Sequence, residues 1–586
     1  MKPNPSIRIA VDIGGTFTDV VLLIDNVETW VTKVSTTPAD PSIAVIDGIR
    51  DALACAGVDG THVSEVIHGT TVGSNAILQK AGAKTGLLTT RGFRDVLEIG
   101  RIRMPEMFDL TWSKPQPLVE RRYRLEIDER ISAQGEIVTR LNEASVLAAG
   151  ETLSAAGIES VAICLINSYA NPVHEQRVEA LLRQHFPQFK TTFSWAVLPE
   201  MKEYERTSTT VVNAYLLVAM QDYLGRIEEG LKRLRITAPL LVMTSNGGVM
   251  GTAAAKAKPV FAVASGPAGG VVGAAHLGKA SHRPNLIVFD MGGTTAKAAI
   301  IENGVPSLTS EYEFREGMST SSRFIKAGGY MLKVPSIDMA EVGAGGGSVA
   351  RVDAGGLIQV GPESVGSTPG PACYGLGNDV PTVTDANLVL GYLNPIGLAG
   401  GQLPIQRQLA ERAIAQHIAE PLNLTLRDAA HGIRAVANAN MARAIRAVTV
   451  ERGKDPRDMT MIAFGGNGGV HAIDVAQQLG IRQVIIPRSS GVFSAVGMLA
   501  ADVEHNFVRV VMREAAQLTE SDLQPLTAAL SISASAALRQ EGFRPDAITL
   551  LWQVDVRFCG QASELTVAFE LGSNAFAEID AAFRKQ

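Results

Sequence analysis

Two short stretches, far apart in the chain, each combine an aspartate with glycine and hydroxyl residues. They read AVDIGGTFTDV at residues 10–20 and VFDMGGTTAKA at residues 288–298. Each has an apolar strand, an aspartate, an apolar residue, Gly-Gly-Thr and a second strand. Glycine lets the backbone turn tightly and brings N–H groups close to a ligand, and a carboxylate at a strand end can hold a hydrated divalent cation. The pattern predicts two hairpins that grip phosphate, although hairpins also use glycine for shape alone.

The positions within these hairpins suggest individual roles. Asp12 and Asp290 are expected to be catalytic carboxylates and ligands of Mg²⁺ or Mn²⁺, with turn capping as the alternative. Asp19 either orients a nucleophile or caps the turn. Phosphoryl transfer needs positioning and charge neutralisation more than covalent chemistry, so no Ser-His-Asp set is required. The residues expected to contact phosphate are Gly14, Gly15, Thr16 and Thr18 in the first hairpin and Gly292, Gly293, Thr294 and Thr295 in the second.

A third glycine cluster, IAFGGNGGVHA at residues 462–472, follows a strand and precedes a helix. A backbone at such a strand end can approach an adenine or ribose, with the helix N-terminus beyond it. Gly465, Gly466 and Asn467 are the expected contacts, and a plain strand–helix turn is the alternative. The cluster matches neither the dinucleotide-binding fingerprint nor the P-loop.

These loops need a mixed α/β framework to position them. Residues 7–35 alternate with a two-residue period, strand–helix segments follow to about residue 190, and a long helix is expected near 204–234. We expect an N-terminal domain at 1–195, a core domain with the other two loops at 196–505, and a small α/β region at 506–586. That last region stops in mid-pattern, which leaves truncation of the chain as an open alternative.

Composition excludes several classes of protein. The 586 residues are 46% hydrophobic and 19% charged, with a net charge of −6, which indicates a globular protein of several domains. The chain has no excess of basic residues, which a nucleic acid partner would require. No apolar run is long enough to span a bilayer. The four cysteines form no CxxC pair, and the first residues do not resemble a signal peptide. A soluble cytoplasmic protein is the expectation.

The three loops, in this order, resemble those of the superfamily of sugar kinases, actin and heat-shock ATPases. The resemblance implies two ribonuclease H-like domains with ATP bound between them. The two hairpins would hold the phosphates and Mg²⁺, and the third loop would meet the adenosine.

Longer motifs resemble the hydantoinase A/oxoprolinase family over nearly the whole chain. They include HGTTVGSNAILQ (68–79), EYERTSTTVVNAY (203–215), ASGPAGGVVGA (264–274), VGAGGGSVARVD (342–353) and GVFSAVGMLAADVEH (491–505). The resemblance implies that ATP phosphorylates a carbonyl or enol oxygen, and that a second, B-type subunit takes part in a hetero-oligomer. One departure concerns Lys297, which stands where relatives often carry an acid; it either binds phosphate or is paired at the surface.

Other polar residues are candidates for the substrate side. His68, Thr70, Thr71 and Asn75 lie on a predicted strand-to-helix loop that would bind a substrate carbonyl or ring nitrogen, with helix capping as the alternative. Ser265 and Gly266 would complete the floor of the site. Asp385 is either catalytic or a helix cap, while His471 and Cys373 are expected to be structural. The segment 343–348 is expected to be an anion-binding nest or a mobile lid.

Three functions remain open from the sequence. The leading hypothesis is an ATP-dependent hydrolase subunit that opens a cyclic amide of the hydantoin, 5-oxoproline or lactam type. The first alternative is an ATP-dependent ketone carboxylase subunit that forms an enol phosphate. The second is a reactivase-like ATPase that does mechanical work on a partner protein.

Overall fold

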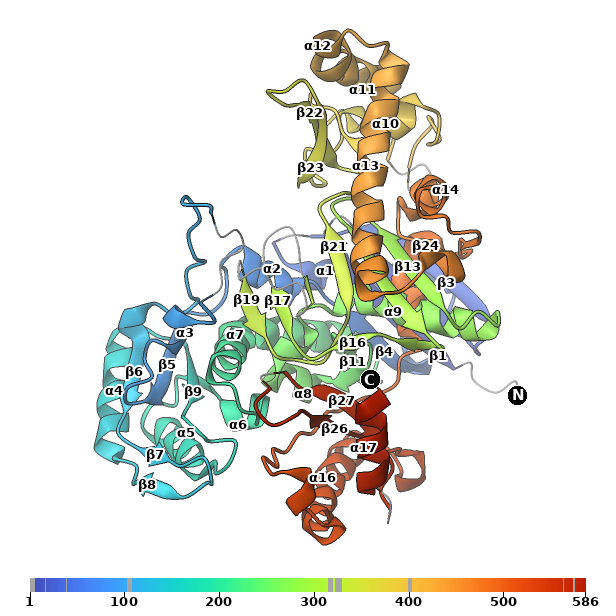
Figure 1. The fold of residues 1–586 in the computed structure, drawn as a ribbon. Coiled ribbons are helices and arrows are strands. Elements are labelled where there is room, and N and C mark those ends of the chain that lie inside the picture. The colour runs from blue at the N-terminus through green and yellow to red at the C-terminus, as the bar shows by residue number, and fades with distance from the viewer. Residues whose placement is uncertain are drawn as a thin grey trace.

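The computed structural model describes residues 6–15, 17–37, 39–102, 108–314, 320–321, 329–398, 403–561, 563–572 and 575–585. Figure 1 shows two central sheets with an attached unit beside them, a helical layer above and a C-terminal region below. Thr16, one of the expected phosphate contacts, lies outside the described residues.

The first sheet has six strands in the order β12-β11-β4-β1-β2-β3. β1, β2 and β3 form the antiparallel meander expected from the two-residue period, while β4 runs parallel to β1 and β11 parallel to β4. Two of its strands lie well beyond residue 195, so the sheet crosses the expected domain boundary. Its strands are β1 (Ile7–Ile13), β2 (Phe17–Ile24), β3 (Glu28–Ser35), β4 (Val63–Gly69), β11 (Leu240–Met243) and β12 (Val249–Gly251).

The second sheet repeats the core of the first. A hairpin of β13 and β14 lies beside β24, which runs parallel to β13 just as β4 runs parallel to β1. β21 pairs with the outer side of β14, as β3 pairs with β2. The strands are β13 (Leu286–Met291), β14 (Ala296–Glu302), β15 (Val305–Pro306), β21 (Met339–Val342), β24 (Thr460–Phe464) and β25 (Val484–Ile485).

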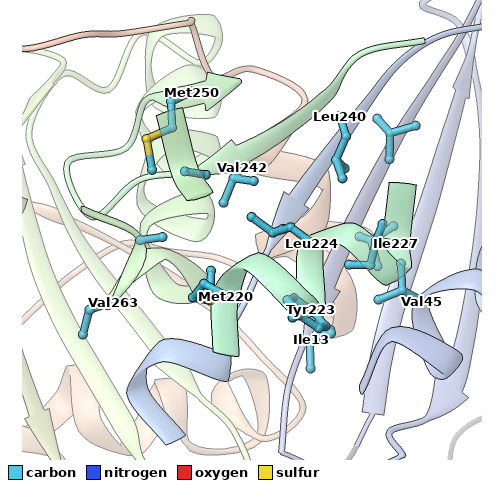
Figure 2. Packing of buried hydrophobic residues seen from close by; sticks show 14 of the residues in the cluster. Ile13, Val45, Met220, Tyr223, Leu224, Ile227, Leu240, Val242, Met250 and Val263 are labelled. Carbon is cyan, nitrogen blue, oxygen red and sulfur yellow. The ribbon is translucent and has the colours of Figure 1, made fainter. Parts of the chain in front are cut away.

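Helices cover both sheets and fill the space between them. Figure 2 shows the core of the first sheet, where Met220, Tyr223 and Leu224 of the long helix α7 lie near strand residues such as Val242. A second core joins α13 and α14 to the second sheet, and a third joins α9 and α15 to strands of both sheets. The helices are α1 (Pro41–Ala56), α2 (Val72–Leu78), α7 (Glu203–Arg233), α9 (Ser265–Ala280), α13 (Leu426–Val448), α14 (Gly468–Leu479) and α15 (Phe493–Met498).

A separate α/β unit is inserted between α2 and α7 and lies at the left in Figure 1. Its four-stranded sheet has the order β10-β9-β5-β6, is parallel throughout and has its own hydrophobic core. The elements are β5 (Thr85–Thr90), α3 (Val96–Ile99), β6 (Arg124–Ile127), β7 (Arg130–Ile131), β8 (Ile137–Thr139), α4 (Glu143–Ala155), β9 (Ser160–Cys164), α5 (Val173–His185), β10 (Lys190–Phe193) and α6 (Ser194–Val197).

The remaining elements form the upper layer and the C-terminal region (Figure 1). Lys202, next to α7, makes a 3.0 Å ion pair with Glu564 and so ties the C-terminal region to the body. The upper layer contains β22 (Ser348–Val352), β23 (Ile358–Ser364), α10 (Val383–Val389), α11 (Arg407–Ile414) and α12 (Glu420–Leu422); the C-terminal region contains α16 (Glu520–Gln540), β26 (Trp552–Val556), β27 (Leu565–Phe569) and α17 (Ala575–Lys585). Short elements elsewhere are α8 (Thr252–Ala257), β16 (Leu308–Thr309), β17 (Tyr312–Phe314), β18 (Thr320–Ser321), β19 (Tyr330–Leu332) and β20 (Ser336–Ile337).

Within the described ranges, every helix is too short or too polar to cross a bilayer.

Glycine allows α9 and α15 to cross with their backbones in contact. A Cβ on Gly497 would overlap the carbonyl oxygen of Gly269 and would lie 2.9 Å from the Cα of Gly273. No side chain fits there, so the close approach of these two helices depends on glycine.

We therefore expect Gly497→Ala to lower the free energy of unfolding by about 3 kcal/mol, because the added methyl group forces the helices apart. Gly225→Ala is the matched control: that glycine lies inside α7 and its Cβ would have no neighbour within 4 Å, so a gain of up to about 1 kcal/mol is expected. Urea denaturation measures both. Equal midpoints for the two variants would contradict the packing argument.

Candidate active site

The two predicted hairpins have matching geometry. The N–H of Gly14 donates to the carbonyl oxygen of Phe17 at 2.9 Å, and the N–H of Gly292 donates to that of Thr295 at 3.1 Å. Each hairpin is therefore closed by a backbone hydrogen bond between residues at the same spacing. The strand register places Asp19 opposite Asp12 in the first sheet and Lys297 opposite Asp290 in the second.

Asp12 carries a carboxylate oxygen without a partner. Its Oδ1 is buried and accepts no hydrogen bond from any residue in the described part of the chain. Burial, followed by the charges of Asp19 and Asp290, raises the pKa of Asp12 to about 8, while Lys297 and Lys33 act in the opposite direction. Asp290 and Lys297 lie close enough to Asp12 for their charges to affect its pKa, which places the two hairpins near one another. A buried, unpaired oxygen in a cluster of carboxylates favours a bound cation.

Asp290 occupies the corresponding position in the second hairpin. Burial raises its pKa to about 6, while the charge of Lys297 opposes this and that of Glu341 adds to it. Lys297 lies 3.7 Å from Glu341, yet its side chain remains 25% exposed. Lys297 is thus paired with Glu341, as one of the two alternatives expected, and its binding to phosphate stays a prediction.

The third glycine cluster packs directly against the second hairpin. The side-chain amide of Asn467 donates to the carbonyl oxygen of Gly292 at 3.1 Å, and its backbone N–H donates to that of Met291 at 2.9 Å. Gly465 has a φ of +83°, and a Cβ there would lie 2.5 Å from Oδ1 of Asp290. The two segments therefore form one continuous surface.

The segment 343–348 joins the same surface. The N–H groups of Gly346 and Gly347 donate to the carbonyl oxygens of Gly292 and Gly293 at 3.1 and 2.6 Å. Thr384 in turn donates through its hydroxyl to the carbonyl oxygen of Gly346 at 2.8 Å. These bonds fix the segment to the hairpin, which does not fit the expected mobile lid.

The expected phosphate contacts divide into two groups. Gly15, Gly293 and Thr294 are exposed at the turns, while Gly14, Gly292 and Thr295 are half-buried. Thr18 is fully buried and its hydroxyl lies 3.1 Å from that of Thr36, on the inner side of the strand. The geometry thus brings the turn residues to the surface of the site but directs Thr18 into the protein.

On the other side of Asp12 lies the start of α9. A Cβ on Gly266 would lie 3.7 Å from Oδ1 of Asp12 and 3.9 Å from Thr71. Ser265 is buried and its hydroxyl donates to the carbonyl oxygen of Thr70 at 3.1 Å. The structure therefore brings Gly266 and Thr71 together with Asp12 and gives Ser265 a structural bond beside them.

His68 lies behind this surface and is fully buried. Its Nδ1 lies 3.2 Å from the carbonyl oxygen of Val11, to which it donates, so its Nε2, 2.7 Å from the hydroxyl of Tyr223, accepts. Thr70 is also buried, and its hydroxyl accepts from the N–H of Val72 in a turn. Asn75, by contrast, is exposed. The predicted substrate loop thus has an inner structural part and an outer accessible part.

Three residues with alternative interpretations are structural. Asp385 is buried and accepts from the N–H groups of Cys373 and Thr382 at 2.8 and 2.9 Å, completing the capping box of α10. Cys373 is buried, and burial raises the pKa of its thiol. His471 is buried between Asn387 and Asn438, with contacts of 2.9 and 2.6 Å. The helix-cap interpretation of Asp385 therefore replaces the catalytic one.

Two of the buried histidines, His68 and His471, should make the fold sensitive to acid. Burial lowers the pKa of His68 from 6.5 to about 4 and that of His471 to about 3. Below pH 6.5 the unfolded chain gains protons that the folded chain does not bind, so stability falls as the pH falls. Each histidine is expected to remove about 1.4 kcal/mol per pH unit. Urea unfolding between pH 7 and 5 measures the slope; a slope unchanged in His68→Gln would contradict this account.

No group of three or more His, Cys, Asp or Glu side chains arranged to hold a metal ion is present in the described ranges. Mg²⁺ commonly uses one or two carboxylates and fills its other positions with water and phosphate oxygens. The unpaired oxygen of Asp12 fits such a cation.

Sequence reasoning missed the side chains that flank the hairpins. Lys33 makes a 2.5 Å ion pair with Asp19, and Glu341 pairs with Lys297. Both lie on the strand next to the outer strand of their hairpin, β3 and β21. The position of Lys33 beside Asp19 could have been predicted from the sequence, because the meander fixes the register of the two strands. Glu341 was not, because nothing local indicates that β21 pairs with β14.

Comparison with known proteins places the chain in a family. The sequence model of the hydantoinase/oxoprolinase family matches residues 206–507, and that of the hydantoinase/oxoprolinase N-terminal region matches residues 8–186. The chain belongs to the hydantoinase/oxoprolinase family. The resemblance seen in its motifs is therefore confirmed.

Members of the hydantoinase/oxoprolinase family with similar sequences differ in their named activities. Uncharacterized protein MJ0964 of Methanocaldococcus jannaschii is 41% identical, over 96% of this chain and 81% of that protein. Caprolactamase subunit alpha of Pseudomonas jessenii is 36% identical, over 96% and 80%. Acetophenone carboxylase gamma subunit of Aromatoleum aromaticum is 33% identical, over 95% and 77%.

Solved structures confirm the fold of this family member. The ATP-dependent caprolactamase from Pseudomonas jessenii aligns with a TM-score of 0.84 at 34% identity, over 99% of this chain and 84% of that one. Nucleotide-free acetone carboxylase aligns with a TM-score of 0.81 at 27% identity, over the same shares. The chain therefore has the mixed α/β fold of these two structures, and its two central sheets repeat one strand arrangement, as predicted.

Proposed function

We propose that this chain is the ATP-dependent subunit of a hydrolase that opens a cyclic amide of the hydantoin, 5-oxoproline or lactam type. The observation that carries the proposal is the pair of matched hairpins, which place Asp12 and Asp290 near one another. Membership of the hydantoinase/oxoprolinase family and the 36% identity with caprolactamase subunit alpha support the substrate class.

The nucleotide would lie across the joined glycine surfaces. The exposed turn residues Gly15, Gly293 and Thr294 offer N–H groups and a hydroxyl to phosphate oxygens. Gly465, Gly466 and Asn467 would meet the adenosine. Asp12 would hold Mg²⁺ or Mn²⁺, with Asp290 facing it from the second hairpin, and the cation would neutralise charge on the phosphates.

The chemistry follows from the low reactivity of an unstrained amide. The amide oxygen attacks the terminal phosphorus of ATP, the bond from that phosphorus to ADP breaks, and an imidoyl phosphate forms. Water then adds to the imidoyl carbon and the ring C–N bond breaks, which leaves an acyl phosphate. A second water hydrolyses that acyl phosphate to the carboxylate and free phosphate. Gly266 and Thr71, beside Asp12, and the exposed Asn75 would line the acceptor side. The buried His68 would stay neutral and structural.

A partner subunit belongs to the proposal. Relatives bear the names of alpha and gamma subunits, so each is one part of an assembly. We propose that a B-type subunit completes the second half of the reaction in a hetero-oligomer.

Ketone carboxylation is the second candidate, because acetophenone carboxylase gamma subunit is 33% identical over 95% of this chain. In that reaction the enol oxygen takes the phosphoryl group from ATP. The enol carbon then attacks CO₂ while the phosphoryl group passes to water, which leaves a keto acid and phosphate. The hairpins and the adenosine loop would serve both reactions alike.

Phosphate release from Mg-ATP by the natively purified complex tests the proposal. Stimulation by a lactam, hydantoin or 5-oxoproline alone would support ring opening. Stimulation only by a ketone with bicarbonate would replace it with carboxylation. Turnover indifferent to both would favour a mechanical ATPase.

A further inference from the structure

The rows of residues that cross the two hairpins differ in where their positive charge lies. Each row runs over three neighbouring strands, and its first member is the hairpin aspartate. The row in the first sheet is Asp12, Asp19 and Lys33, and the row in the second is Asp290, Lys297 and Glu341. The first row places its lysine on the outermost of the three strands, whereas the second places it directly beside the aspartate.

This difference changes what each aspartate offers a ligand. Asp12 has another carboxylate as its cross-strand neighbour and an oxygen without a partner in the described part of the chain. Asp290 has Lys297 as its cross-strand partner, so an ammonium group lies on the same face of that hairpin. Asp290, Lys297 and Pro267 of α9 also lie around one narrow gap, which is too small for a water molecule.

Lys297 is held in place without being enclosed. Glu341 lies 3.7 Å from its ammonium nitrogen and anchors it from the outer strand. A quarter of the Lys297 side chain is exposed, and its ammonium group has three N–H donors, more than the one ion pair with Glu341 requires. The ammonium group of Lys33 has different partners. It lies 2.5 Å from the carboxylate of Asp19 and above the ring of Phe17, 5.1 Å from the ring centre.

We propose that Lys297 is a nucleotide-binding residue that contacts the phosphate oxygens beside Asp290, and that the site takes one divalent cation, at Asp12, rather than two. The inference rests on the proposed function and narrows it. Lys297 meets the charge of Asp290 from within the protein, so Asp290 is not a direct metal ligand. The two hairpins thus neutralise phosphate charge in different ways. The first holds a metal ion and the second presents an ammonium group.

Two effects of opposite sign distinguish this role from a structural one. Lys297→Met removes a charged donor to phosphate, so ATP binding measured without divalent cation should weaken about tenfold or more. The same change leaves Asp290 without its cation, so Mn²⁺ binding without nucleotide should tighten. Lys33→Met is the matched control, since it removes an equal charge from the first row and should change metal-free ATP binding far less.

Isothermal titration measures ATP in EDTA, and Mn²⁺ electron paramagnetic resonance measures the free ion. One Mn²⁺ per wild-type chain, two per chain in Lys297→Asp, and weaker metal-free ATP binding in Lys297→Met would support the inference. Unchanged ATP and Mn²⁺ binding in Lys297→Met would overturn it. Glu341→Gln gives an independent variant: it frees Lys297 and should tighten metal-free ATP binding, and a loss would count against the inference. A wild-type chain that binds no ATP under any condition would instead refute the proposed function.

Discussion

Asp12→Asn is expected to lower ATP-dependent phosphate release by about 10³-fold or more, because a neutral amide cannot hold the divalent cation that neutralises the phosphates. Asn has the same shape, and the buried oxygen of Asp12 has no hydrogen bond to lose among the described residues. Replacing a carboxylate in a cluster of like charges should also relieve repulsion. The variant should therefore fold at least as stably as the wild type. Steady-state phosphate release and urea unfolding measure the two properties.

The control for this experiment is Asp51→Asn, since the side chain of Asp51 is 47% exposed on α1 and pairs only with its neighbour Arg50 in the described structure. It should leave both properties unchanged. If Asp12→Asn retained more than a tenth of wild-type turnover, Asp12 would not be the carboxylate of the metal ion, and the assignment of the first hairpin would fail.

Gly465→Ala should damage the fold and the nucleotide site together. The added Cβ would lie 2.5 Å from both Oδ1 of Asp290 and the carbonyl oxygen of Met291. A left-handed backbone adds strain for any residue with a Cβ. We expect a loss of about 2–4 kcal/mol in unfolding free energy and at least a tenfold loss of ATP affinity, because the second hairpin must shift.

Gly453→Ala separates the two causes. Gly453 has a φ of +73°, close to the +83° of Gly465, but a Cβ at this position would have no neighbour within 4 Å. It should show only the backbone cost, about 1–2 kcal/mol, and no loss of ATP affinity. Equal losses for the two variants would mean that the contact with Asp290 is unimportant.

The hairpins were predictable because their information is local. Alternating apolar residues, an aspartate at the strand end and Gly-Gly-Thr at the turn specify strand, site and bend within a dozen residues. The repeated pattern at residues 288–298 then implied a second sheet of the same kind, and the structure contains it. Strand alternation also indicates which hairpin residues lie on the same face. Thr18 was expected to contact phosphate, but its side chain is buried.

The partners of these residues were not predictable, because they come from distant segments. Glu341 reaches Lys297 only through the pairing of β21 with β14. The burial of His68 depends on Tyr223 in α7, far along the chain. Asp385 looked equally suited to catalysis and capping until its four donors, three backbone N–H groups and one hydroxyl, were known.

The late arrival of β11 has a consequence for synthesis. β4 ends at Gly69 and pairs with β1 on one side. On its other side it pairs with β11, which begins only at Leu240, after the whole inserted unit and α7. The inserted unit has its own core, so it can fold while the first sheet is still incomplete. During that interval one edge of β4 has no strand to pair with, and an unpaired edge is a template for other chains. A ribosome that pauses before residue 240 therefore holds a nascent chain whose first sheet is open along β4, where association with other chains can begin.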